Sequence, residues 1–244
     1  MIKGGEFLIK DQEAKDIFIP EEFGEDQLMM ASATKEFVEK ELDPHREQFE
    51  KKDYQLTEDC MKKAGELGLL GISVPSEYGG MGMPFNTSVL ICDKISGANG
   101  SFSTAFGAHT GIGTLPILLY GDDAQRKKYL PKLATGEWMG CYCLTEPGAG
   151  SDANSGKTKA VLTKDSKHYL ITGQKMWISN AGFADVFIVF ARIEDDKNIT
   201  GFILEKEMEG ITMGEEEYKL GLNSSSTRQV FFNETKVPIE DMLS

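Results

Sequence analysis

The chain has 244 residues, of which 40% are hydrophobic and 27% are charged, as is usual for soluble globular proteins. Its 26 Lys and Arg against 39 Asp and Glu give a formal net charge of −13, and without a basic run such a chain is a poor candidate for nucleic-acid or anionic-membrane binding. No apolar stretch is long enough for a membrane span, the N-terminus lacks the apolar segment of a signal peptide, and four cysteines do not form a disulfide framework, so we expect a reducing, cytoplasmic compartment.

The first half of the chain has helical periodicity. Between Glu25 and Glu50, apolar side chains recur at steps of three and four residues with charges between them, which predicts a helix that Pro44 ends or kinks. These apolar residues are Leu28, Ala31, Phe37, Val38 and Leu42. Thr57 is the candidate N-cap of a second helix, which Gly68 is placed to end.

Further segments complete the helical part. The stretch SVPSEYGGMGMP has the composition of turns. It is followed by two strongly apolar segments that we expect to form buried helices, FNTSVLICDKISGA and GIGTLPILLYG. The segment DDAQRKKYLPKLATG has acidic residues at its start and a closing glycine, which predicts a short helix or two.

After Gly136 the apolar period shortens to two residues, which is typical of strands. Seven short segments have this pattern: WMGCYCLTE, TKAVLT, HYLITGQKMWIS, ADVFIVFARIE, TGFILEK, GITMG and RQVFFNETKVP. Their number and spacing favour a β-sandwich or barrel. We therefore expect an α+β multidomain chain, with an N-terminal arm (residues 1–24), an all-helical domain (25–136) and an all-β domain (137–244).

One stretch, TEPGAGSDANSGKT, ends like a phosphate-binding loop. A Walker A motif needs a glycine, four residues and then Gly-Lys-Ser/Thr, and it must open a helix. Here the residue five places before Gly156 is Ser151, and the residues after Thr158 have the pattern of a strand. Spacing and context both argue against a P-loop, so ATP binding through Lys157 is the least favoured function.

The segment CYCLTEPGAGS is rich in groups that could bind a ligand. If residues 141–144 form a strand, Tyr142 and Leu144 face one side while the two cysteines face the other, and we interpret the cysteines as buried packing residues rather than metal ligands. The turn EPGAGS exposes amides and a hydroxyl that suit a polar ring edge or a phosphate, and a plain connecting loop is an equal alternative. We expect Glu146 to accept local backbone hydrogen bonds rather than act as a general base.

A second segment, GQKMWISNAG, places a tryptophan beside a hydroxyl and an Asn-Ala-Gly turn. Such a side chain could stack on a planar cofactor, although a tryptophan in the core of a β-domain is the commoner arrangement. The three histidines, His45, His109 and His168, are too scattered in sequence to predict a site, so we expect surface or packing roles for them.

YCLTEPGAGSD followed by GQKMWISN resembles the paired signature of the acyl-CoA dehydrogenase family. Four further blocks occur in the order found in that family: LGLLGISVPSEYGGMG, GAHTGIGTLPILLYG, GFILEKEMEGITMG and FFNETKVPIEDML. The resemblance therefore covers most of the chain. The segment DIFIPEEF in the N-terminal arm is most similar to the very-long-chain type of the family.

The resemblance implies an FAD-dependent enzyme that oxidises the Cα–Cβ bond of a fatty acyl-CoA to trans-2-enoyl-CoA and passes electrons to an electron-transferring flavoprotein. The residues that match the family's flavin-binding positions are Tyr142, Leu144, Thr145, Gly150, Ser151, Trp177, Ile178 and Ser179. By the same resemblance, Thr145 would lie near the reactive flavin edge and Trp177 against the ring. Ser151 would also contact the thioester arm of the substrate, and Ser179 stands where many members have threonine.

The resemblance also implies a three-part architecture whose C-terminal helical bundle is absent from this chain. The family's catalytic glutamate and much of its subunit interface would lie beyond Ser244. We therefore expect the 244 residues to carry no catalytic residue, to bind FAD weakly and to have no dehydrogenase activity alone. When full length, the protein is expected to be a homo-oligomer.

Other functions remain open from the sequence. An acyl-CoA oxidase or a nitroalkane oxidase has a similar architecture and differs in how oxygen reaches the flavin. A non-catalytic module that binds FAD and acyl-CoA without chemistry is an alternative of a different class, because no base is expected in the chain. The preferred acyl length stays open as well, because the small residues of SFSTAFGAHTGIG either leave room for a long chain or let helices pack closely.

Overall fold

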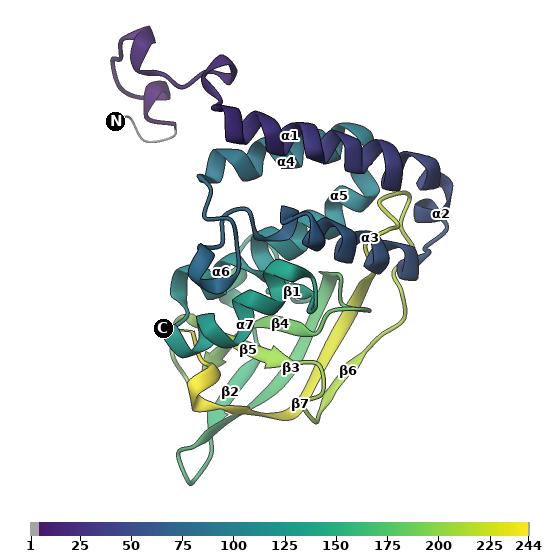
Figure 1. Ribbon diagram of the computed structural model, residues 1–244. Coiled ribbons are helices and arrows are strands. Elements are labelled where there is room, and N and C mark those ends of the chain that lie inside the picture. Colours follow the sequence, from purple (N-terminus) through teal and green to yellow (C-terminus); the bar gives the residue numbers. More distant parts are fainter. Residues whose placement is uncertain (1–4, 244) are drawn as a thin grey trace.

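The computed structural model describes residues 5–243, so the first four residues of the predicted arm and Ser244 lie outside the described residues. Helices cover one side of a curled sheet, and the N-terminal arm extends away from the start of the first helix (Figure 1). The described part of the arm contains three short 3₁₀ turns: Glu6–Leu8, Ala14–Asp16 and Pro20–Glu22.

Seven α-helices lie within residues 5–243. They are α1 (Glu25–Phe37), α2 (Arg46–Glu50), α3 (Tyr54–Glu66), α4 (Phe85–Ala98), α5 (Gly100–Gly107), α6 (Leu115–Tyr120) and α7 (Asp123–Thr135). Two π-helical segments, Val38–Leu42 and Ala108–Gly113, continue α1 and α5, and Pro44 lies in a 3₁₀ turn before α2, as the sequence predicts. None of the helices in this described range has both the length and the apolar character that crossing a bilayer requires.

The predicted start of α3 is wrong. The helix begins earlier, at Tyr54, and its N-cap is Asp53, whose carboxylate accepts the backbone N–H of the third helical residue at 3.1 Å. Thr57 is buried in the first turns of the helix, where its hydroxyl lies 2.9 Å from the hydroxyl of Ser224, in the segment that rises from the sheet to α2 (Figure 1). The predicted end is confirmed, because Gly68 follows the helix with a φ of +76°.

Seven strands within the described range form one curled sheet, and they coincide with the seven predicted segments. The strands are β1 (Gly140–Cys143), β2 (Lys159–Leu162), β3 (His168–Ser179), β4 (Val186–Ile193), β5 (Ile199–Glu205), β6 (Ile211–Met213) and β7 (Thr227–Pro238). Their order is β1-β4-β2-β3-β7-β6, with β5 paired to β4. A helical part followed by a β part is therefore confirmed.

Strands β1 and β2 pair with the same edge of β4. Within β4, Val186 pairs with β1 on one side and with β5 on the other, and Arg192 pairs with β2 on one side and with β5 on the other. Because a strand has only two hydrogen-bonding edges, β1 and β2 follow one another along the edge opposite β5. Residues 144–158 are thus an excursion between two strands held by one edge.

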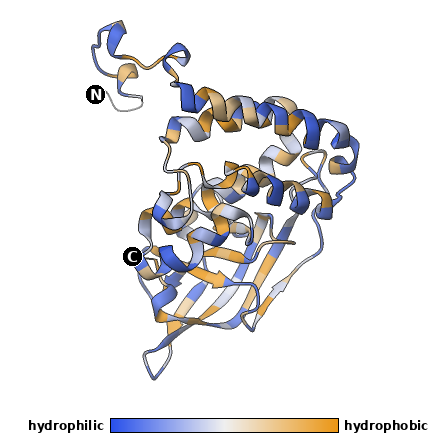
Figure 2. Ribbon diagram, viewed as in Figure 1, coloured by the Kyte–Doolittle hydropathy of each residue, from blue (hydrophilic) through white to orange (hydrophobic). Residues whose placement is uncertain are grey.

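The hydrophobic core lies on both faces of the sheet. Along β4, Phe187 and Val189 point into the cluster enclosed by the curled sheet, while Val186 and Ile188 pack against the helices. The same alternation holds in β1, where the two cysteines face the enclosed cluster and Tyr142 faces the helical side, as predicted. Apolar residues are concentrated on the strands and on the inward sides of the helices (Figure 2).

His109 joins the helical part to the first strand. Its buried ring accepts the backbone N–H of Gly140 at Nδ1 (3.0 Å) and lies 2.9 Å from the carbonyl oxygen of Leu133 at Nε2. Because an amide only donates and a carbonyl only accepts, Nε2 carries the proton and the ring is neutral. Burial lowers the pKa of His109 to about 4. Nearby, Gly113 packs against the backbone of Gly140, so a packing role for this histidine is confirmed.

Candidate functional site

The two ligand-binding segments predicted from the sequence lie side by side. The backbone N–H of Met176 in β3 donates to the carbonyl oxygen of Thr145, just after β1, at 2.9 Å. This hydrogen bond places Thr145 next to the end of β3 that carries Trp177. Two segments separated by about thirty residues of sequence thus form one surface. The resemblance to the paired signature of the family implies this arrangement.

Trp177 is held outside the core by its backbone. The register of β3 with β7 shifts between Lys175 and Ile178, and Trp177 within this bulge has a φ of +62°. A left-handed backbone is uncommon for a bulky residue, and a bulge redirects the side chain that it carries. The indole is 55% exposed, so it is not the core tryptophan that the alternative interpretation proposed.

Three hydroxyl groups of the site are free of protein partners. The side chains of Thr145 and Ser179 are half-buried and that of Ser151 is exposed, and none of them makes a hydrogen bond within residues 5–243. Hydroxyl groups can donate and accept. They are therefore available to the polar edge of a ligand that lies against the indole.

The remaining predicted residues have more varied positions. Tyr142 is half-buried with its ring centre 5.0 Å from that of Phe190, and Leu144, two residues further along the chain, is also half-buried. Gly150 is exposed, with open space where a Cβ would lie. Ile178 is 2% exposed and belongs to the core of the sheet, so its side chain does not contribute to the outer surface of the site.

Glu146 is held by hydrogen bonds inside the excursion. Its carboxylate accepts the backbone N–H groups of Lys157 (2.6 Å) and Thr158 (3.0 Å) and the ammonium of Lys175 (2.7 Å). Burial raises the pKa of Glu146, but the hydrogen bonds outweigh it and the net pKa is lowered. The prediction that this carboxylate satisfies backbone donors is confirmed. The same two amides are not free for a phosphate, and Thr158 is followed by a strand, which excludes the P-loop.

Lys175 is the residue of this region that the sequence reasoning missed. It is 2% exposed, and besides Glu146 its ammonium binds the carbonyl oxygen of Leu144 at 3.0 Å. A signal was present in the period of β3, because residue 175 shares a strand face with Ile171, which is buried in the core. A lysine at an inward position of a strand predicts a buried acidic partner.

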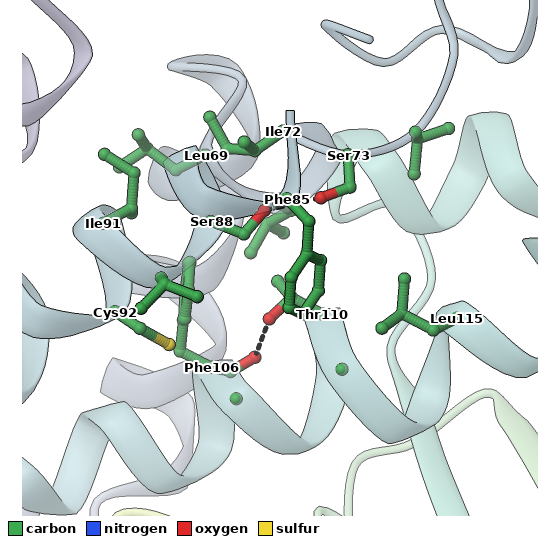
Figure 3. A pocket seen from close by; sticks show the side chains of 15 residues that line it. Leu69, Ile72, Ser73, Phe85, Ser88, Ile91, Cys92, Phe106, Thr110 and Leu115 are labelled. Atoms are coloured by element: carbon green, nitrogen blue, oxygen red, sulfur yellow. Dashed lines mark hydrogen bonds between the residues drawn. The ribbon is translucent and has the colours of Figure 1, made fainter. Parts of the chain in front are cut away.

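A second feature is a cavity of about 200 Å³ among the helices (Figure 3). It lies between α4, the junction of α5 with the following π-helical segment, and the turn after α3. The wall is mainly apolar, with Leu69, Ile72, Phe85, Ile91, Phe106 and Leu115 among its side chains. Its hydroxyl groups are satisfied internally, because those of Ser73 and Ser88 lie 2.6 Å apart and Thr110 donates to a backbone carbonyl at 2.9 Å. The cavity therefore suits an apolar chain.

Some glycines of this region leave room for a ligand, and another allows close packing. Gly107 and Gly111 line the cavity, and a Cβ on either would have open space around it. Gly113 instead packs on β1, where a Cβ would lie 2.8 Å from the carbonyl carbon of Gly140. Small residues thus leave room at two positions and allow close packing at the third.

Comparison with known proteins agrees with this geometry. The family model "Acyl-CoA dehydrogenase, N-terminal domain" matches residues 24–137, and "Acyl-CoA dehydrogenase, middle domain" matches residues 141–235. A probable acyl-CoA dehydrogenase of Bacillus subtilis (strain 168) is 48% identical over 241 residues, which are 99% of this chain and 40% of the relative. The mitochondrial very long-chain specific acyl-CoA dehydrogenase of Rattus norvegicus is 40% identical over 197 residues, 78% of this chain and 30% of the relative.

A solved structure has the same fold. The crystal structure of an acyl-CoA dehydrogenase from Bacillus anthracis complexed with FAD matches with a TM-score of 0.95 and 45% identity, over 100% of this chain and 42% of that chain. The chain therefore spans less than half the length of these similar proteins.

Proposed function

The chain belongs to the acyl-CoA dehydrogenase family, whose cofactor is FAD, and on this premise we propose that it supplies the flavin-binding and acyl-binding surfaces of a fatty acyl-CoA dehydrogenase. The proposed reaction converts the acyl thioester to a trans-2-enoyl thioester. The observation that carries the proposal is the exposed Trp177, held by a bulge beside the unpartnered hydroxyl of Thr145.

The residues of the site fit a flat, polar-edged ring. The indole of Trp177 offers an apolar face for stacking, and the hydroxyl groups of Thr145 and Ser179 can donate to the edge where negative charge develops. Ser151, on the exposed turn, is placed in the proposal against the thioester arm. Bound FAD would accept the hydride that leaves Cβ.

The acyl chain is proposed to enter the cavity beside α4, whose apolar wall excludes water from the chain. Glu146 is not the base of the proposed reaction, because its carboxylate already accepts three hydrogen bonds. We assign that role to the catalytic glutamate that the resemblance to the family implies. An electron-transferring flavoprotein is the proposed electron acceptor, and family membership supports it.

Removing the indole should weaken FAD binding. We expect Trp177→Ala to lower the affinity of the chain for FAD at least about tenfold, because the stacking surface is lost. Its thermal midpoint should stay near that of the wild type, since the side chain is more exposed than buried. The measurement is a titration of flavin fluorescence, with the thermal transition followed by circular dichroism.

The matched control is Trp138→Phe, the other tryptophan of the chain, which packs under the ammonium of Lys132 at 3.7 Å from its ring centre. This variant should keep the wild-type affinity for FAD. Equal FAD affinities of the wild type and Trp177→Ala would remove the assigned role of Trp177, and a wild-type chain that takes up no FAD would contradict the proposal. If flavin-loaded chain is not bleached by a fatty acyl-CoA, the 244 residues bind without chemistry, as the internally bonded Glu146 leads us to expect.

A further inference from the structure

A buried ion pair lies directly behind the two segments of the proposed flavin site. Lys175 is 2% exposed and Glu146 is 7% exposed, and their side chains meet at 2.7 Å. Glu146 directly follows Thr145, and Lys175 directly precedes the Met176–Trp177 bulge. Glu146 is therefore one residue from Thr145, and Lys175 is two residues from Trp177.

The hydrogen bonds of this pair connect three strands at one point. The ammonium of Lys175 in β3 binds the carbonyl oxygen of Leu144 at the end of β1. The carboxylate of Glu146 accepts the amides of Lys157 and Thr158, which directly precede β2. Together with the bond from Met176 to the carbonyl of Thr145, these contacts fix the excursion against β3 on both sides of Thr145.

Stability alone is a poor explanation for such a pair. Desolvating two charges offsets much of their attraction, and replacing a buried pair by neutral groups of similar size is often neutral or stabilising. Most ion pairs of this chain avoid that cost, since they involve exposed side chains such as Lys127 with Asp123. What the buried pair supplies that an apolar contact would not is direction, because both oxygens of Glu146 and two of the three ammonium protons of Lys175 have defined partners.

We propose that Lys175 is a positioning residue for the flavin site, acting through Glu146 and the carbonyl of Leu144 to set the position of Thr145 relative to Trp177. The inference rests on the proposed function. Lys175 itself does not reach the surface and touches neither cofactor nor substrate in this arrangement. Because Lys175 affects the geometry of the site, loss of the ion pair should reduce FAD affinity more than it reduces the stability of the fold.

The experiment compares two variants with the wild-type chain. Lys175→Met leaves Glu146 buried without its partner, so its thermal midpoint should fall clearly. The double variant Lys175→Met with Glu146→Gln removes both charges and should recover part of that loss. Recovery is incomplete because the single amide oxygen of glutamine can accept only one of the N–H groups of Lys157 and Thr158 that bind separate carboxylate oxygens. We expect FAD affinity to drop at least tenfold in both variants, with no recovery in the double variant. Flavin-free protein gives an independent readout, in which the amide signal of Thr145 and the indole signal of Trp177 should shift in ¹H–¹⁵N spectra of the double variant.

Glu205→Gln is the matched control, because Glu205 also pairs with a lysine, Lys128, at 2.8 Å and accepts from Tyr129. It should leave FAD affinity and the two reporter signals unchanged. The proposal is overturned if FAD affinity recovers together with stability in the double variant. It is also overturned if that variant binds FAD as tightly as the wild type. Absence of FAD binding by the wild type instead contradicts the proposed function, and the reporter signals then decide the inference: unchanged signals overturn it and shifted signals support it.

Discussion

Replacing His109 with leucine should lower the free energy of unfolding by about 1–3 kcal/mol. The substitution leaves the N–H of Gly140 buried without its partner, which costs about 1–3 kcal/mol, while the carbonyl oxygen of Leu133 keeps its hydrogen bond from the backbone N–H of Gly136 at 3.3 Å. Both groups lie where the last helix and the first strand meet. Denaturant unfolding followed by far-ultraviolet circular dichroism measures the difference, and a loss below about 1 kcal/mol would mean that water or a rearrangement satisfies the N–H of Gly140.

The same residue should make the stability of the wild type depend on pH. The folded-state pKa of His109 is lowered to about 4, from an unfolded value of 6.5, so the unfolded chain binds the extra proton first as the pH falls. Stability is therefore fully present above pH 6.5 and is lost as the pH falls toward 4. At 1.36 kcal/mol per pH unit, the loss between pH 7.5 and pH 5 is about 2 kcal/mol.

The window from pH 7.5 to pH 5 separates this effect from the carboxylates whose pKa values are lowered. The lowered pKa values of Glu146, Glu205 and Glu216 also reduce stability in acid, but chiefly below their unfolded value of 4.5. The His109→Leu variant should lack the dependence in this window, and the control His168→Gln should retain it. Equal slopes in the wild type and His109→Leu would assign the titration to another group.

Adding one methyl group at Gly65 should lower the free energy of unfolding by about 3 kcal/mol or more. Gly65 in α3 is buried against the end of α7, where a Cβ would press on the carbonyl oxygen of Thr135 and lie 2.5 Å from its carbonyl carbon. Backbone atoms cannot move aside as a flexible side chain can, so Gly65→Ala must separate the two helices. Thermal and denaturant unfolding of the variant test the expectation.

Gly97→Ala is the matched control, since it makes the same chemical change in another helix. A Cβ on Gly97 in α4 meets no atom within 4 Å, so the substitution should stabilise the chain by about 0.5–1 kcal/mol through the lower entropy of the unfolded state. Opposite signs for the two variants are expected. Loss of stability in both would mean that helix interiors respond to alanine for a reason other than the contact at Thr135.

Local patterns were enough to predict most elements of this fold, although no pattern predicted the helix α5 (Gly100–Gly107). The helix α4 and the seven strands follow from apolar period and turn residues, which are set within a few residues of chain. The predicted start of α3 was wrong because the sequence contains two candidate N-cap residues. Asp53 caps the helix, while the hydroxyl of Thr57 is hydrogen-bonded to the hydroxyl of Ser224. That contact spans more than half of the chain, so a local signal does not contain it.

The residues of the candidate site were named from the sequence, whereas their relative positions required the structure. The patterns placed Thr145 and Trp177 in two separate segments, and only the pairing of the sheet shows that Met176 joins them. The exposure of Trp177 depends on a bulge, which is a register shift between two distant strands. Lys175 was overlooked because a lysine is ordinarily a surface residue, and its buried partner lies on another strand.

The excursion between β1 and β2 is flanked by two strands whose registers are fixed independently of each other. Both strands pair with the same edge of β4. The carboxylate of Glu146 joins the two ends of the excursion by accepting the amides of Lys157 and Thr158. Residues 147–152 can therefore change in length or sequence without slipping the sheet, whereas the carbonyls of Asn154 and Gly156 are bound by Arg192 of β4. The entropy of closing this loop is separate from the pairing of the strands. New recognition surfaces can therefore be grafted into the loop, or new chain termini can be placed in it.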